Sequence, residues 1–159
     1  MSKKPKIGVY ICHCGGNISD TVDVEKVKES IASLDGVEIT ETNEYVCSSP
    51  GQDMIKNDIK NHNLNRIIVA SCSPRMHLET FKRTVAEAGL NQYLFEMVNI
   101  REQDSWVHSN VDQATLKATD LIRGAVNRAK YLKGLKPKKM NVTECSRNRR
   151  GDRWNFSIS

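Results

Sequence analysis

Four short apolar runs alternate along the chain with segments in which apolar residues recur at helical spacing. Each run is rich in β-branched or aromatic residues and is bounded by turn-forming residues, which is typical of strands in a covered sheet. The predicted strands span residues 7–12, 37–46, 66–70 and 93–100. The predicted helices span residues 21–34, a segment that opens at Ser49 and Pro50, a segment that opens at Ser73 and Pro74, and residues 113–132.

This alternation of strands and helices with short connections predicts an α/β fold, a Rossmann-like parallel sheet of about four strands with helices on both faces. The strand at 37–46 has polar residues in its middle (Thr40, Glu41 and Thr42), so we expect it at a half-exposed edge of the sheet. In such sheets, ligands bind beyond the carboxyl ends of the strands. Residues that follow a strand end are therefore the first candidates for function.

The C-terminal part of the chain differs in composition from the rest. We expect residues 1–134 to form one α/β domain, and residues 135–144, which begin LKPKK, to form a linker. Residues 145–159 show no strand pattern and no glycine-rich loop, so we expect a disordered tail. A one-base shift of the reading frame would permit a strand that runs into G-x-G-x-x-G. We hypothesise that this tail is the frameshifted start of a dinucleotide-binding domain.

Length and charge limit the classes of partner. The chain has 159 residues, which favours a single domain with an ordinary core. Of the net charge of +5, the last fifteen residues carry +3 (four arginines and one aspartate), which leaves +2 for residues 1–144. No basic patch in the body indicates nucleic-acid binding, and no apolar run approaches the ~18 residues of a membrane span. With no signal peptide evident, we expect a cytoplasmic protein that binds neither nucleic acid nor membrane.

Four of the five cysteines fall where predicted strands end. Cys12 and Cys14 close the first strand, Cys47 follows the second strand and Cys72 follows the third. An odd cysteine count in a cytoplasmic chain argues against a disulfide framework and favours metal or redox chemistry. Because parallel strands end at the same edge of a sheet, the predicted fold would bring these four thiols together.

Three functional interpretations of the four cysteines stay open, beside the possibility that they are ordinary small core residues. They could ligate one [4Fe–4S] cluster, and amide groups at the helix starts after Ser49 and Ser73 would then stabilise its negative charge. They could bind zinc, which the absence of Cys-x-x-Cys pairs disfavours. Alternatively, Cys12 and Cys14 could act as a redox dithiol.

Other residues beside the cysteines have both a functional and an ordinary explanation. Arg75 and His77 could donate hydrogen bonds to the site or simply begin a surface helix. Trp106 and His108 could line a cofactor edge, although an aromatic residue after a strand is expected more often in the core.

Several blocks of the sequence resemble the N-terminal domain of the A subunit of heterodisulfide reductase. The blocks are CHCGGNISDTVDV, YVCSSPGQ, VASCSPRMHLETF and YLFEMVNIREQDSWVH, and the resemblance covers roughly residues 6–144. It implies one [4Fe–4S] cluster in this domain and leaves Cys145 outside the matched blocks. A FAD domain follows in the full-length family member, so the resemblance implies that the tail at 145–159 is the frameshifted start of that FAD-binding domain. We expect FAD in the full-length protein and not here. The cysteines that match the cluster ligands are Cys12, Cys14, Cys47 and Cys72.

The resemblance also implies partners, namely the other heterodisulfide reductase subunits and a hydrogenase or formate dehydrogenase as electron donor. We therefore expect an electron-relay domain that exchanges single electrons with a flavin or another cluster. We expect no complete heterodisulfide reductase turnover from this chain alone. Two alternatives stay open: a docking module stabilised by zinc or a cluster, and a small dithiol oxidoreductase that uses Cys12 and Cys14.

Overall fold

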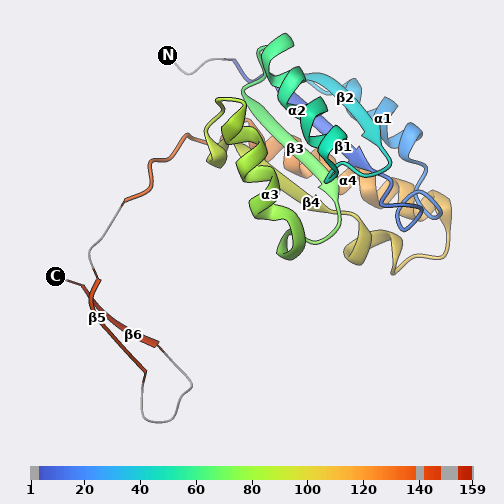
Figure 1. The fold of residues 1–159 in the computed structure, drawn as a ribbon. Helices are drawn as coiled ribbons and strands as arrows, with labels where there is room; N and C mark the ends of the chain where they lie inside the picture. The colour runs from blue at the N-terminus through green and yellow to red at the C-terminus, as the bar shows by residue number, and fades with distance from the viewer. Residues whose placement is uncertain (1–3, 139–141, 148–153, 159) are drawn as a thin grey trace.

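Four parallel strands form the sheet of the computed structural model, which describes residues 4–138, 142–147 and 154–158 (Figure 1). The predicted α/β fold with a four-stranded parallel sheet is confirmed. The strands, in the spatial order β2-β1-β3-β4, are β1 (Ile7–Cys12), β2 (Val37–Asn43), β3 (Arg66–Ser71) and β4 (Phe95–Asn99). The helices are α1 (Val24–Ala32), α2 (Ser49–Asn61), α3 (Pro74–Glu87) and α4 (Val111–Ala129), with a 3₁₀ turn η1 (Gln92–Leu94) and a π-helical turn η2 (Arg101–Ser105).

Two helical layers cover the sheet, one on each face. α1 and α4 pack on the face that receives Val9 and Ile11 of β1, whereas α2 and α3 pack on the face that receives Tyr10 and Cys12. Successive side chains of a strand point to opposite faces, so β1, which is buried throughout, contributes to both hydrophobic cores. Burial on both faces explains why its sequence is a continuous apolar run rather than an alternating one.

β2 lies at one edge of the sheet, as its polar middle predicted. Of its seven residues only Thr40 is buried. The strand ends at Asn43 rather than at residue 46, because the backbone turns over residues 44–47 before α2 begins. The N-cap of α2 is Ser48, the residue before the expected helix start at Ser49.

The strand order places a topological switch point between β1 and β3. The connection after β1 leads through α1 to β2 on one side, whereas the connection after β2 leads through α2 to β3 on the other side. In open α/β sheets, ligands bind at such a point, outside the carboxyl ends of the strands. Cys12 is the last residue of β1 and Cys72 comes directly after β3, so the two cysteines flank the switch point.

Beyond residue 138 the structure describes two antiparallel strands, β5 (Val142–Arg147) and β6 (Trp154–Ile158), which Figure 1 shows apart from the four-stranded sheet. This differs from the absence of a strand pattern that we expected over residues 145–159. A two-stranded hairpin is at best marginally stable by itself. Residues 139–141 of the expected linker, and 148–153 and 159 of the expected tail, lie outside the described residues. The domain limits at 134 and 144, the disorder of the tail and the frameshift hypothesis stay predictions.

The helices of the four-stranded unit are amphipathic. The longest, α4, has 19 residues and buries small and aliphatic side chains such as Ala118, Ile122 and Val126. In the part of the chain that the structure describes, no helix combines the length and the apolar character that crossing a bilayer requires. The expected cytoplasmic location stays a prediction.

Candidate functional site: four thiols at the carboxyl edge of the sheet

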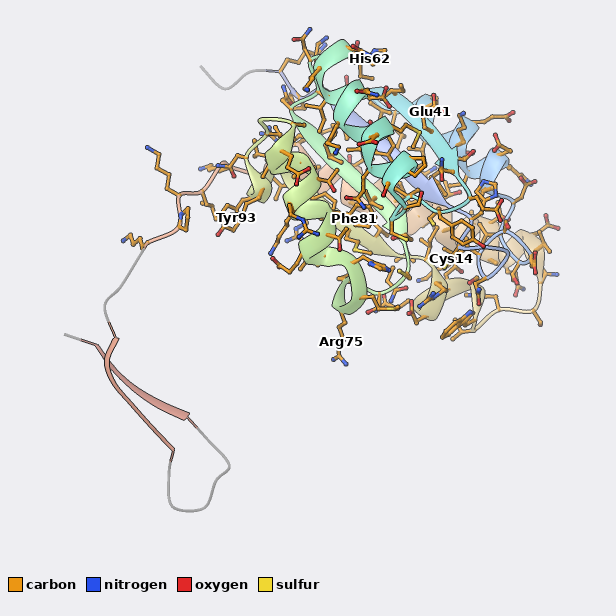
Figure 2. The ribbon with its side chains drawn as sticks, viewed as in Figure 1. Cys14, Glu41, His62, Arg75, Phe81 and Tyr93 are labelled. Atoms are coloured by element: carbon orange, nitrogen blue, oxygen red, sulfur yellow. The ribbon has the colours of Figure 1, made fainter. Side chains whose placement is uncertain are left out.

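Four cysteine side chains lie at the carboxyl edge of the sheet, and all four are free thiols. Cys12 and Cys72 are almost fully buried, with 3% and 5% of their surface exposed. Cys14 and Cys47 are partly exposed. Cys14 lies two residues beyond β1, in the loop where Figure 2 labels it, and Cys47 lies in the turn between β2 and α2.

The thiols lie close enough to influence one another electrostatically. Burial is the largest effect that raises the pKa of Cys12 to about 11, and negative charge at Cys14 and Cys47 adds to it. The nearby backbone N–H groups of Val46 and Cys14 act in the opposite direction, and the Cys12 thiol donates to the Glu44 carbonyl at 3.6 Å. Burial also raises the pKa of Cys72, whose electrostatic neighbours include Cys14 and Cys47. The structure thus gathers the four cysteines that the sequence singled out.

Cys14 has a left-handed backbone conformation, with φ at 56°, and the two glycines after it have φ at 59° and 92°. For a residue with a Cβ atom this conformation costs about 1–2 kcal/mol, so it persists only where neighbouring contacts fix the backbone. The backbone N–H and the side-chain amide of Asn17 both donate to the Cys14 carbonyl, at 3.1 and 3.0 Å. This turn reverses the chain directly after β1 and keeps the Cys14 thiol at the sheet edge. Strain of this kind is common at functional sites.

α2 and α3 begin in the same way, because each follows a cysteine and a capping serine. Ser48 follows Cys47 and caps α2, and Ser73 follows Cys72 and caps α3; each hydroxyl accepts a first-turn N–H at 3.3 Å. Neither first turn contains an acidic residue. The positive ends of both helix dipoles are therefore not compensated by an acidic residue within the first turn.

Arg101, in η2, is a residue of this site that the sequence analysis did not single out. Its Nη1 atom lies 3.1 Å from the Sγ atom of Cys14, and its Nη2 atom lies 2.8 Å from Oε1 of Glu102. Burial by itself lowers the pKa of Arg101, but the hydrogen bonds to Glu102 and Cys14 outweigh this effect and hold the pKa above its ordinary value. The guanidinium is therefore a fixed positive charge beside a thiol. The available signal was its position two residues after β4, at the same edge as the cysteines.

The other residues weighed near the cysteines have different neighbours. Arg75 points away from the body of the domain in Figure 2, and His77 packs edge-on against the ring of Phe81. The expectation of a core position for Trp106 was wrong, because 58% of its surface is exposed. His108 lies with Nδ1 3.1 Å from a carboxylate oxygen of the buried Asp104.

The gathered thiols do not form a cage for one ion. Among the described residues, no group of three or more histidine, cysteine, aspartate or glutamate side chains is placed to hold a single metal ion. A tetrahedral zinc site requires four sulfurs at about 2.3 Å from one centre. In a [4Fe–4S] cluster each thiolate binds a different iron, so the sulfurs stand farther apart.

Fold and site together define the class of protein: an α/β domain that presents four free thiols at the switch point of a parallel sheet. No family model matches the chain. Curated proteins match it closely. The chain is 54% identical over 143 residues to the A subunit of the H(2):CoB-CoM heterodisulfide,ferredoxin reductase of Methanothermobacter marburgensis, with 89% of this chain and 22% of that protein covered.

Two further relatives agree with this match. The second iron-sulfur A subunit of the CoB-CoM heterodisulfide reductase of Methanopyrus kandleri is 52% identical over 143 residues, again 89% of this chain and 22% of that protein. The A subunit of the H(2)/formate:CoB-CoM heterodisulfide,ferredoxin reductase of Methanococcus maripaludis is 46% identical over 139 residues, 87% of this chain and 21% of that protein. The chain is thus a homologue of the heterodisulfide reductase A subunits, which confirms the resemblance found in the sequence, and it spans about a fifth of the length of these relatives.

Proposed function

We propose that this domain holds one [4Fe–4S] cluster and relays single electrons within a heterodisulfide reductase-type complex. The observation that carries the proposal is the gathering of four free thiols from three strand ends at the switch point of the sheet. The name of the Methanopyrus kandleri relative, which describes an iron-sulfur protein, supports the same class of cofactor. The proposed ligands are Cys12, Cys14, Cys47 and Cys72.

The environment of the thiols fits a metal group that carries them as thiolates. Burial favours the neutral thiol at Cys12 and Cys72, so a bound cation must supply the charge that drives the protons off. Donor or cationic groups lie beside the sulfurs: backbone N–H groups near Cys12, the guanidinium of Arg101 at Cys14, and the starts of α2 and α3. One acceptor is also present, because the Cys12 thiol donates to the Glu44 carbonyl at 3.6 Å. Donors and positive charge stabilise a net-negative thiolate assembly.

Each part of the chain has a defined task in this proposal. A cluster bound at this edge would supply one-electron chemistry. Cys12 and Cys72, almost fully buried, hold it away from water, and Cys14 and Cys47, partly exposed, lie on the side open to a partner. The Val46 N–H lies near the sulfur of Cys12, where it would stabilise a bound thiolate.

The names of the relatives indicate the partners. They describe reductases that act with hydrogen or formate and ferredoxin. We propose that the other subunits of such a complex, with a hydrogenase or a formate dehydrogenase as donor, exchange electrons with this domain. FAD belongs to the longer relatives in this proposal and not to the residues present here.

The dithiol alternative is less well supported than the cluster. The reactive form of a cysteine is its thiolate, and burial raises the pKa of Cys12 to about 11, which leaves it protonated at neutral pH. A zinc-stabilised docking module remains the main competitor, and one experiment separates it from the cluster.

The test is anaerobic purification, with iron, acid-labile sulfide and zinc counted per chain and an EPR spectrum recorded after reduction with dithionite. We expect about four iron ions and about four sulfides per chain, and a near-complete loss of both in Cys47→Ser and in Cys72→Ser. Cys145→Ser is the matched control, because it removes the cysteine outside the gathered set and should retain the full iron content. Zinc in place of iron would refute the relay and establish the docking module.

A further inference from the structure

Arg101 is enclosed by the groups around it, with only 13% of its side chain exposed. Both terminal nitrogens of its guanidinium have partners, the buried Nε has none, and the flat face is covered by an aromatic ring. The partners are Cys14 Sγ at 3.1 Å, Glu102 Oε1 at 2.8 Å, Met76 Sδ at 3.2 Å and the Trp106 ring, whose centroid lies 4.8 Å away.

The backbone that carries Arg101 is fixed as tightly as its side chain. The Asn99 side chain, at the end of β4, accepts the N–H groups of Arg101 and Glu102 at 3.2 and 3.0 Å. The backbone N–H of Ser73, the cap of α3, donates to the Glu102 carboxylate. Burial by itself raises the pKa of Glu102, but its hydrogen bonds to Arg101 and Ser73 lower it overall, so the carboxylate stays charged and holds the guanidinium in place.

A purely structural ion pair would not need the contact with Cys14. Glu102 binds Nη2 of the guanidinium, which leaves Nη1 able to point to solvent or to a backbone carbonyl. Instead it points at a sulfur, which is a weak acceptor as a neutral thiol and a strong one as a thiolate. A thiolate bound to a metal group would accept this hydrogen bond more strongly than a neutral thiol does.

We propose that Arg101 is a positioning residue that raises the reduction potential of the metal group bound at this edge, through its charge and its hydrogen bond to Cys14. This inference rests on the proposed function. Reduction adds one electron to the cluster and its thiolates, so the reduced state is the more negative one. A fixed positive charge beside a ligand sulfur stabilises the reduced state more than the oxidised state and shifts the potential upward.

The experiment is a redox titration of the anaerobically purified protein, followed by EPR, for Arg101→Met and the wild type. We expect Arg101→Met to retain its iron and to have a midpoint potential lower by about 59 mV, which corresponds to a tenfold change in the one-electron equilibrium constant. Arg101→Lys keeps the charge but loses the planar guanidinium, so its potential should fall between the two. Arg75→Met is the matched control, because Arg75 lies at the same edge of the sheet but points away from the body.

Iron content separates a failure of this inference from a failure of the proposed function. A wild type without iron and sulfide would remove the function and the inference together. An Arg101→Met protein with full iron and an unchanged potential, or with a shift no larger than that of Arg75→Met, would overturn the inference alone. If Arg101→Met does not fold, Trp106→Leu removes the exposed ring that holds the guanidinium. It should lower the potential by a smaller amount, and an unchanged potential there would also overturn the inference.

Discussion

The two helical layers on the sheet begin their helices differently. α1 and α4 carry an acidic residue in the first turn, Glu25 and Asp112, which stabilises the positive end of each helix. α2 and α3 carry none, and each begins directly after a cysteine and its capping serine. The α1 and α4 layer therefore has an acidic residue inside each first turn, whereas the α2 and α3 layer has none, and the cap of α3 faces the Glu102 carboxylate from outside the helix. The layer of α2 and α3 supports the candidate site as well as the fold.

The hydrophobic cores beneath the two layers also differ, in whether they contain side chains that can ionise. The buried members of the core under α1 and α4 are isoleucine, valine and alanine side chains. The core under α2 and α3 also contains Tyr10 and Cys12, whose side chains can ionise. The hydroxyl of Tyr10 lies 3.2 Å from a carboxylate oxygen of Asp58 on α2. The α2 and α3 layer thus combines packing with polar chemistry, and this combination can be tested by experiment.

The largest expected effect is a pH dependence of the free energy of unfolding, which comes from the core under α2 and α3. In the metal-free protein, burial raises the pKa of Cys12 from 9.0 to about 11. The neutral thiol is favoured in the folded state, so its contribution to stability is present below about pH 9 and is lost as the pH rises toward 11. Two pKa units correspond to roughly 2–3 kcal/mol. Urea unfolding across this range should show a steeper loss of stability for the wild type than for Cys12→Ala, and parallel curves would contradict the prediction.

The next largest expected effect is the change in the free energy of unfolding when one glycine of each layer is replaced by alanine. A Cβ atom on Gly51, in the first turn of α2, would lie 2.5 Å from the backbone oxygen of Val46, whereas a Cβ on Gly124 in α4 would meet nothing within 4 Å. Gly51→Ala should therefore lower the free energy of unfolding by about 1–3 kcal/mol, since the backbone must shift. Gly124→Ala should raise it by about 0.5–1 kcal/mol. Equal effects in urea unfolding would show that α2 does not depend on close approach to the turn before it.

The smallest expected effect comes from a change of charge in the first turn of a helix. Ser49→Glu places a carboxylate in the exposed first turn of α2, and we expect it to stabilise the metal-free protein by about 0.3–1 kcal/mol. The same charge lies next to Cys47, so it should lower the midpoint potential of the iron-loaded protein. Glu25→Gln in α1 is the converse control: it should lower stability by a similar amount, about 0.3–1 kcal/mol, and leave the potential unchanged. Identical potentials in all three proteins would show that the two layers do not differ electrostatically at the site.

The local parts of this protein could be predicted from its sequence, because they depend on neighbouring residues. The apolar run of β1 predicted a strand buried on both faces, and the polar middle of β2 predicted an edge strand. The Ser-Pro pairs predicted helix starts, although the cap of α2 proved to be Ser48 because the chain turns after Asn43. Strands that end in cysteines, in a parallel sheet, were enough to predict that the four thiols would meet.

The exact neighbours of each thiol were decided by the tertiary structure. Arg101 reaches Cys14 across 87 residues of sequence, and no local pattern encodes such a contact. It depends on the strand order β2-β1-β3-β4, which carries the end of β4 and the π-helical turn after it to the edge where β1 also ends. The exposure of Trp106 has the same origin, because its ring covers a guanidinium at the surface instead of filling the core. The sequence by itself determined that cysteines follow the strand ends, and the packing of distant strand ends decided which charges face them.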